Sequence, residues 1–361
     1  MINLFCIRPK GFNIGNDAIF MGLRHFIHEA FGQVVNLIEL PATSRYESQA
    51  KGGLTSKTIY EINQYGHGVI VGGGNLYENG ELDVTLDALK TLEVPLMLFS
   101  ISRGRIYNRQ CKLVERTDVM PDRVLKAIHD RANYSLARDS STYDHLRKLG
   151  CENALLGGCP TLFLNKIADT LPQVPTHDRG EVLISVRHPS LMNIPLQKQA
   201  QVATDIRGVV AFLRGEGHTD IRLLCHDHRD LTFAASFPDL DYVYTGDIYT
   251  YLSLLRNCAL NITYRLHSSL PCFSFGVPTI HIGYDERANS LFETVGLGDW
   301  NFDMVTVKDT VAAVISRYRR LAEFPKIREA ALPVWQKFYG VMQSNFTSFA
   351  KDVTAYRNST L

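Results

Sequence analysis

An arginine and a histidine two residues apart, Arg265 and His267, are the side chains best suited to chemistry in this sequence. Residues 260–264 are predicted to form a buried strand, the turn after it carries both side chains, and Ser268 opens a short apolar helix. A cation and a titratable imidazole therefore lie where a strand ends and a helix begins, which is where open α/β sheets bind ligands. The sequence predicts the functional site at this turn.

Three more arginines follow predicted strands at the same edge of their sheets: Arg103, Arg138 and Arg187. A single arginine in such a place is usually a surface or ion-pair residue. Three in succession favour an electropositive cleft that binds a negatively charged ligand.

A glycine run from Gly72 to Gly74, followed by Asn75, ends another predicted strand. Glycines let the backbone approach a ligand closely and leave the next helix N-terminus free to bind an anion. A tight turn without a ligand explains the run equally well, and it matches neither nucleotide-binding glycine pattern. Asn16 and Asp17 stand at the entry of the first helix, where they are either caps or cleft residues.

The sequence His226-Asp227-His228 after a strand has ligand types that metals use. No third or fourth ligand stands at a recognisable spacing, so we expect no metal and interpret His226 as a polar residue of the cleft.

The elements that must position these residues alternate along the chain. Short continuous apolar runs and helical patterns follow one another through the first 160 residues and again after residue 181, which is typical of parallel sheets covered on both faces. Residues 166–180 lose all periodicity and are interpreted as a linker. We predict an α/β protein of two facing doubly wound, Rossmann-like domains, 1–165 and 181–322, in a GT-B-like architecture. Helices in 323–361 are expected to pack back on the first domain.

Composition narrows the possible partners and the location. Hydrophobic residues make up 45% and charged residues 21% of the chain, and the net charge is +1, so charge favours no nucleic acid partner. Seven scattered cysteines without a C-x-x-C pair favour reduced thiols. No apolar run approaches the ~20 residues of a membrane span, and the first residues lack a signal core, so we expect a cytoplasmic protein.

Several motifs in order resemble one known family, the polysaccharide pyruvyl transferases. They are GNDAI, VIVGGGNL, LARDSSTYDHLRKLG, GGCPT, YRLHSSLPCFSFGVPTIHIGYDER and LFETVGL, spread over residues 13–298. The resemblance implies a GT-B-like fold and transfer of the enolpyruvyl part of phosphoenolpyruvate onto a carbohydrate as a ketal. The resemblance implies no cofactor besides this donor. The carbohydrate acceptor would be free, nucleotide-linked or lipid-linked. A lipid-linked acceptor would place the protein at the membrane surface.

Two positions depart from the family pattern. The family commonly has Gly-Asp-Pro where this chain has Gly158-Cys159-Pro160, which removes a carboxylate at a strand end. Where the family often has Tyr-Asp-Pro-Lys, this chain has Tyr284-Asp285-Glu286-Arg287, so that Arg287 stands in for the lysine and is expected to touch a phosphate.

The resemblance also suggests roles for the turn. Arg265 would hold an anion in bidentate fashion, and the His267 imidazole would move a proton. A structural hydrogen bond that caps the following helix is the alternative for His267. The remaining residues predicted to bind substrate are Asn16, Asp17, Gly73, Gly74, Asn75, Arg103, Arg138, Arg187, His226 and Arg287.

Two other functions fit the same skeleton. One is a GT-B glycosyltransferase that uses a nucleotide sugar, with Glu286 as the only candidate for an acid that holds the ribose. The other is a non-catalytic relative that binds a glycan. The absence of a carboxylate at Cys159 favours this second alternative. The sequence does not determine the acceptor or the oligomeric state.

Overall fold

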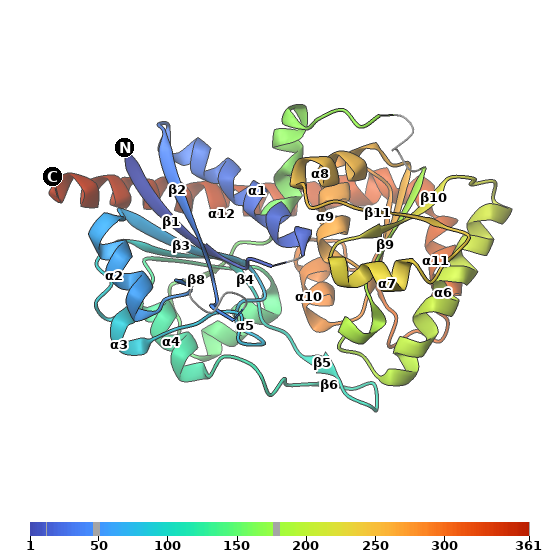
Figure 1. The fold of residues 1–361 in the computed structure, drawn as a ribbon, viewed down its shortest axis with the longest axis horizontal. Coiled ribbons are helices and arrows are strands. Elements are labelled where there is room, and N and C mark those ends of the chain that lie inside the picture. Colours follow the sequence, from blue (N-terminus) through green and yellow to red (C-terminus); the bar gives the residue numbers. More distant parts are fainter. Residues whose placement is uncertain (12, 46–50, 176–180, 361) are drawn as a thin grey trace.

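Two parallel six-stranded sheets form the framework of the computed structural model, which describes residues 1–11, 13–45, 51–175 and 181–360 (Figure 1). The first sheet has the order β2-β1-β3-β4-β7-β8, with β1 (Ile2–Arg8), β2 (Val35–Pro41), β3 (Gly68–Gly74), β4 (Leu96–Ile101), β7 (Tyr134–Ala137) and β8 (Ala154–Leu156). The second has the order β11-β10-β9-β12-β13-β14, with β9 (Val182–Val186), β10 (Ile221–Cys225), β11 (Asp241–Tyr244), β12 (Leu260–Thr263), β13 (Thr279–Gly283) and β14 (Phe302–Asp303).

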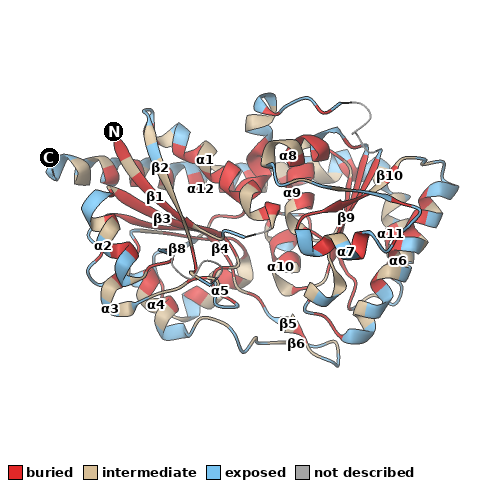
Figure 2. Ribbon diagram, in the orientation of Figure 1, coloured by how far each residue is buried: buried red, intermediate tan, exposed pale blue. Residues whose placement is uncertain are grey.

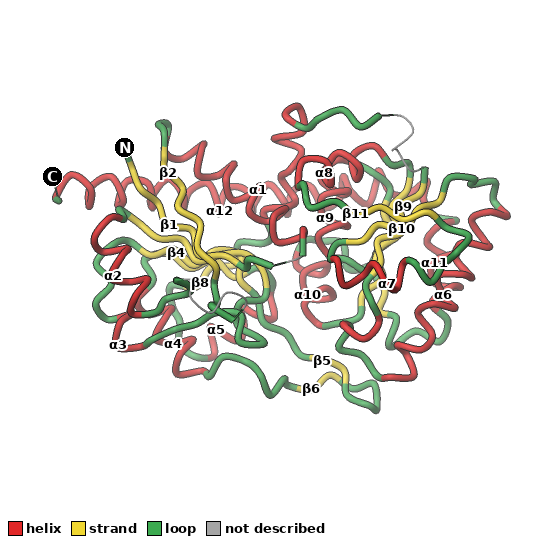
Figure 3. Tube along the Cα trace, in the orientation of Figure 1, coloured by secondary structure: helices red, strands yellow, loops and turns green. Residues whose placement is uncertain are grey.

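Helices flank each set of strands (Figure 3). The first domain contains α1 (Ile14–Phe31), α2 (Ser56–Tyr65), α3 (Leu86–Leu89), α4 (Asp122–Arg131) and α5 (Ser140–Lys148). The second contains α6 (Leu196–Gly215), α7 (Leu231–Ala234), α8 (Ile248–Asn257), α9 (Leu266–Phe275), α10 (Glu286–Thr294) and α11 (Thr310–Tyr318), and α12 (Phe324–Ser359) ends the chain. The predicted pair of Rossmann-like domains is confirmed.

The inner strands have the burial that their sequences predict. Every residue of β3, β4 and β9 is buried, and the centre of both sheets is solvent-free (Figure 2). A strand covered on both faces needs apolar side chains at successive positions, which is why these strands are continuous apolar runs.

The segment between the domains begins as a run of 3-10 helix, Pro160–Thr170, that packs against α1 and α9. Helix α1 approaches it closely, since a Cβ added at Gly22 would lie 2.8 Å from the Pro160 carbonyl oxygen. Of the predicted linker, residues 176–180 lie outside the described part of the chain.

Helix α12 connects the two domains over its 36 residues. Near its start the Trp335 indole donates to the Val295 carbonyl of the second domain (2.8 Å), and near its end Asp352 accepts from the Tyr134 hydroxyl of β7 (2.6 Å). The helix extends from the second domain to the end of the molecule where the N-terminus lies (Figure 1). Its apolar side chains join one core with residues of both domains, including Phe26 and Phe292.

Phe346 of α12 lies at the centre of this shared core, stacked on Phe26 with ring centroids 5.6 Å apart and edge-on to Phe99 at 5.1 Å. Replacing Phe346 with alanine is expected to lower the free energy of unfolding by about 3–5 kcal/mol, because it removes buried apolar surface and leaves a cavity. Urea denaturation measures this loss. The exposed neighbour Thr347 is the matched control, and its replacement with alanine should change stability by no more than about 0.5 kcal/mol.

A short hairpin of β5 (Ile106–Tyr107) and β6 (Leu113–Val114) reaches from the first domain to the second (Figure 1). Tyr107 is buried in the core of the second domain, and its hydroxyl donates to Asp303 (2.7 Å). The two domains therefore touch at this arm as well as through α12. Within the described residues, no helix is both long and apolar enough to cross a membrane.

Candidate active site

A cavity of about 460 Å³ lies between the domains, at the carboxyl ends of strands from both sheets. Its size is in the range of small-molecule sites, and open α/β sheets bind ligands at this edge. Most of the predicted site residues line it: Asn16, Gly74, Asn75, Arg138, Arg187, His226, Arg265, His267 and Arg287. Elements far apart in sequence thus supply one cavity.

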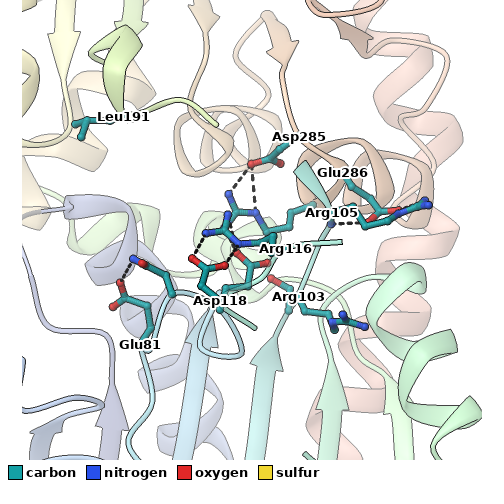
Figure 4. A network of polar contacts seen from close by, with 12 residues as sticks. Glu81, Arg103, Arg105, Arg116, Asp118, Leu191, Asp285 and Glu286 are labelled. Carbon is teal, nitrogen blue, oxygen red and sulfur yellow. Dashed lines mark hydrogen bonds and ion pairs between the residues drawn. The ribbon is translucent and has the colours of Figure 1, made fainter. Parts of the chain in front are cut away.

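Three predicted site residues are not part of the cavity lining. Arg103 turns away from Asp285 and donates instead to Glu115 (2.7 Å), with its other terminal nitrogen 2.6 Å from His145 (Figure 4). Asp17 pairs with Arg8 (2.8 Å). Gly73 has φ +83° and faces α1, where an added Cβ would lie 2.4 Å from the Ile19 side chain.

The N-terminus of α1 reaches from the first domain into the site. Its N-cap residue, Asn13, accepts from the backbone N–H of Gly15 (3.1 Å) and from the Arg265 guanidinium of the second domain (2.9 Å). The backbone N–H of Ile14 donates to the His226 carbonyl (3.0 Å). The positive end of the α1 dipole therefore faces the cavity beside a buried arginine.

Arg265 is held from two sides and keeps one nitrogen free. Its side chain is 5% exposed, Asn13 accepts from Nη2, and Nη1 lies 4.0 Å from Asp230. Nη1 has no hydrogen-bond partner among the described residues. A buried donor without a partner is unusual, and a ligand anion would satisfy it.

His267 occupies the first turn of α9 with a non-helical backbone (φ −88°, ψ 21°). Its carbonyl accepts from the Tyr251 hydroxyl (2.8 Å), while Nε2 is buried without a partner in the described chain. The side chain of the N-cap residue, Arg265, makes no capping hydrogen bond to α9. Burial lowers the pKa of the imidazole well below its usual value, and Arg138, Arg265 and Arg287 lower it further.

Arg138 and Arg187 face the cavity from opposite domains. Arg138 is 3% exposed and donates to the Ser102 hydroxyl, and its Nε has no partner among the described residues. Arg187 donates to the Leu191 carbonyl (3.0 Å), and burial lowers its pKa, with a further contribution from Arg265. Neither guanidinium pairs with a carboxylate in the part of the chain that the structure describes. Two cations of the cavity lining that form no ion pair in the described residues, one buried and one partly buried, favour an anionic ligand.

Arg287 lines the cavity but is fully engaged by carboxylates. Its Nε and Nη2 donate to Asp285 (3.2 and 2.5 Å), and Nη1 donates to Glu78 of the first domain (3.0 Å). Burial alone would lower the pKa of Arg287, but Asp285 and Glu78 outweigh it and raise the pKa. This residue therefore links the domains. The sequence predicts that Arg287 touches a phosphate, but its nitrogens already donate to these two carboxylates.

Glu286 is occupied as well. It accepts from the backbone N–H and from Nε of Arg105 in the first domain (2.7 and 2.8 Å; Figure 4). The loop that carries Arg105 lies so close to α10 that a Cβ at Gly104 would lie 2.5 Å from Cγ of Arg287. Arg116 and Asp118 pair beside this contact (2.6 Å) and complete the polar network at the domain junction.

The Cys159 thiol stands near Arg138, where the family commonly has a carboxylate. It is fully buried, lies 3.1 Å from the Thr161 hydroxyl and is not part of the cavity lining. Burial raises the pKa of the thiol, so it is neutral. The departure at Cys159 therefore leaves the nearby guanidinium without the counterion that an aspartate would provide.

The residues around His226 do not form a metal site. The Asp227 carboxylate accepts from the side chain and from the backbone N–H of Arg229. Both ring nitrogens of His226 lie near the Tyr251 hydroxyl, at 3.1 and 3.3 Å. Burial lowers the pKa of His226 well below the usual value, and Arg265 adds to this. The described residues contain no group of three or more His, Cys, Asp or Glu side chains placed to hold a metal.

Sequence reasoning missed several lining residues, among them Asn13 and His281. Asn13 precedes a predicted helix, as a cap would, and nothing in the sequence indicates its contact with an arginine 252 positions away. His281 lies within a buried apolar strand, β13. A histidine between isoleucines in such a strand was the only available signal for it.

Comparisons with known proteins agree with this architecture. Solved structures that match include UDP-GlcNAc 2-epimerase of Methanocaldococcus jannaschii (13% identity, TM-score 0.54, covering 89% of this chain and 92% of that one). S. aureus MnaA with UDP is similar, with 14% identity and a TM-score of 0.55 over 92% of this chain and 91% of that one. UDP-GlcNAc 2-epimerase of Neisseria meningitidis has 10% identity and a TM-score of 0.54 over 99% of this chain and 100% of that one. At this identity the likeness concerns the fold alone, which is GT-B-like.

Curated proteins contain no match to this sequence. The sequence model of the family described as polysaccharide pyruvyl transferase, in contrast, matches residues 13–286, most of the chain. This range includes the turn with Arg265 and His267, the glycine run and all four strand-end arginines. The chain therefore belongs to the polysaccharide pyruvyl transferase family, and it is a transferase of polysaccharide synthesis.

Proposed function

We propose that this transferase uses phosphoenolpyruvate as its donor and forms a pyruvate ketal on two hydroxyls of a carbohydrate. The observation that carries the proposal is the set of guanidiniums in the cavity lining that donate no hydrogen bond to a carboxylate among the described residues. Arg138 and Arg187 pair with no carboxylate among the described residues, and Arg265 presents an unpartnered Nη1. Phosphoenolpyruvate carries a phosphate and a carboxylate, and it would satisfy guanidiniums from both domains at once.

Part of the remaining lining can hydrogen-bond to an uncharged acceptor. Asn16 and Asn75 of the first domain present side-chain amides to the cavity, which can donate and accept hydrogen bonds as sugar hydroxyls require. The donor would therefore lie against the guanidiniums, and the sugar against the amide-lined wall. The proposal includes no cofactor. It places the reaction in the cytoplasm, and at the membrane surface if the acceptor is lipid-linked.

The proposed reaction balances with two proton movements. Two acceptor oxygens form bonds to C2 of the donor, the bond from C2 to the phosphate oxygen breaks, and the methylene C3 gains one proton and becomes a methyl group. The two hydroxyls lose two protons. One of them balances the proton that C3 gains from the protein, and the other leaves with the phosphate. His267, with its unpartnered Nε2 among the guanidiniums, is the proposed group for one of these transfers.

A nucleotide-sugar donor fits the cavity less well. Glu286, the only acid that the sequence suggests for holding a ribose, is bound by three nitrogens of Arg105. The structural relatives that bind UDP share only 10–14% identity with this chain, so their ligand does not transfer to it.

Incubation with phosphoenolpyruvate and a panel of free, nucleotide-linked and lipid-linked sugars tests the proposal. We expect acceptor-dependent release of inorganic phosphate and a new methyl carbon signal from donor labelled with ¹³C at C3. Phosphoenolpyruvate, but not UDP, GDP or CMP, should raise the melting temperature. Stabilisation by a nucleotide with no response to phosphoenolpyruvate would contradict the proposal and favour a glycosyltransferase.

A further inference from the structure

We infer that His281 is a second imidazole of the reaction, which contacts the acceptor at Nε2 and takes the proton of one hydroxyl. The inference rests on the proposed function and adds a residue to it. His281 lies inside β13 and within one of the motifs that resemble the family, but the sequence analysis assigns it no role.

The His281 ring is held in place by two contacts. Its Nδ1 lies 2.7 Å from the Ser269 hydroxyl of α9, and its face stacks on Phe292 of α10 with centroids 4.5 Å apart and planes 13° from parallel. The residue is 1% exposed and belongs to the cavity lining. Nε2 is buried and has no partner among the described residues.

A structural histidine in this protein has a different arrangement. His129 is also 1% exposed, and both of its ring nitrogens have partners: the Tyr77 hydroxyl at 2.8 Å and the Ser135 hydroxyl at 2.8 Å. Leaving a buried polar atom unpaired destabilises the folded protein, so a histidine kept only for packing would be paired at both ends. The single unpaired nitrogen of His281, at the cavity, therefore indicates a ligand contact.

The hydrogen bonds around Ser269 favour a proton-accepting Nε2. The Ser269 hydroxyl lies 3.4 Å from the Arg265 carbonyl, to which it can only donate. A hydroxyl that donates there accepts from Nδ1–H of His281, and this tautomer places the lone pair on Nε2.

The charges around the two imidazoles differ in sign. Three guanidiniums, those of Arg138, Arg265 and Arg287, oppose protonation of His267. His281 faces the neutral Ser269 on α9 and, at the N-terminus of α10, the Asp285 carboxylate. Burial lowers the pKa of His281 to about 3, and Asp285 opposes this shift. His281 is therefore neutral before the reaction, and a carboxylate stabilises it after it takes a proton.

The balance of the reaction requires two proton movements from two hydroxyls. A single imidazole can hold only one of these protons at a time. His267 beside the guanidiniums and His281 beside Asp285 give the cavity lining two imidazoles, each with a buried Nε2 that has no partner among the described residues. The hydroxyl proton that His281 accepts passes to the departing phosphate, which leaves as its monohydrogen form.

Two substitutions test this role. His281→Gln places an amide near the Nε2 position without a proton-accepting imidazole, and His281→Asn retains only the part that reaches Ser269. We expect both to lower kcat for phosphate release by about 100-fold or more, while the KM for phosphoenolpyruvate changes by less than about threefold. His129→Gln is the control, which should lower the melting temperature but leave kcat within about threefold. A kcat for either His281 variant within tenfold of the unchanged protein would overturn the proposal.

A binding measurement separates this inference from the proposed function. In protein labelled with ¹⁵N-histidine, the His281 ring signal is the one that His281→Gln removes. In the presence of saturating phosphoenolpyruvate, we expect at least one sugar of the panel to shift this signal without shifting the His129 signal. Such a shift without phosphate release would contradict the proposed function and support the contact at Nε2. A His281 signal that no sugar of the panel changes would overturn the contact.

Discussion

Replacing Arg265 with methionine is expected to weaken phosphoenolpyruvate binding by two to three orders of magnitude. Removing one partner from a buried, hydrogen-bonded charge pair costs about 2–5 kcal/mol, and Arg265 is 5% exposed, lines the cavity and has an Nη1 without a hydrogen-bond partner among the described residues. The substitution also removes the hydrogen bond to Asn13 that fixes the N-terminus of α1. Titration of the melting temperature with phosphoenolpyruvate, together with kcat/KM for phosphate release, measures the effect.

Two controls define what the Arg265 result means. Arg265→Lys keeps the charge but loses the planar fork, so binding should fall between that of the unchanged protein and that of the methionine variant. Arg214→Met removes an exposed arginine that pairs with Asp239 far from the cavity, and it should leave donor binding unchanged. If Arg265→Met bound phosphoenolpyruvate within threefold of the unchanged protein, the donor would not lie at this turn.

Replacing His267 with alanine is expected to lower kcat by about 10²–10⁴-fold, the range for loss of a general acid or base. Donor binding should change little, because Arg138, Arg187 and Arg265 remain. In the ligand-free protein burial and the nearby guanidiniums hold the pKa well below its usual value, so the imidazole is neutral at pH 7. A bound phosphate and carboxylate offset the guanidinium charges, which raises this pKa and lets the imidazole carry a proton.

Single-turnover phosphate release and the donor-induced thermal shift, measured on the same sample, separate chemistry from binding. His228→Ala is a suitable control, since this side chain is half-exposed and lies outside the cavity lining. An unchanged kcat for His267→Ala would remove the role assigned to this imidazole. A loss of the donor-induced thermal shift would instead assign His267 to binding.

The contacts between the domains suggest how the site keeps its geometry. Arg287 bridges Asp285 and Glu78, Glu286 holds Arg105, and α12 contributes to a core that both domains share. The departures from the family pattern at Glu286 and Arg287 therefore supply contacts across the domain junction. A site built from two domains needs such contacts to hold its guanidiniums at a fixed separation.

The sequence by itself determined the class of fold and the edge of the sheets at which the site lies. Continuous apolar runs of strand length that alternate with helical patterns require parallel sheets covered on both faces, and parallel strands bring their carboxyl ends to one edge. This rule was sufficient to bring Arg138, Arg187, Arg265 and His267 into one cavity. It depends only on local patterns, which a sequence displays directly.

Only the tertiary structure decided which of the polar residues near that edge are open to a ligand. Arg103 follows its strand as Arg138 does, but the loop turns it toward Glu115 and His145. Arg287 finds its second partner, Glu78, 209 positions away, and His281 gains its position from α9 and α10. Pairing, burial and an unpaired nitrogen are properties of contacts between distant segments, and local sequence patterns contain no information about them.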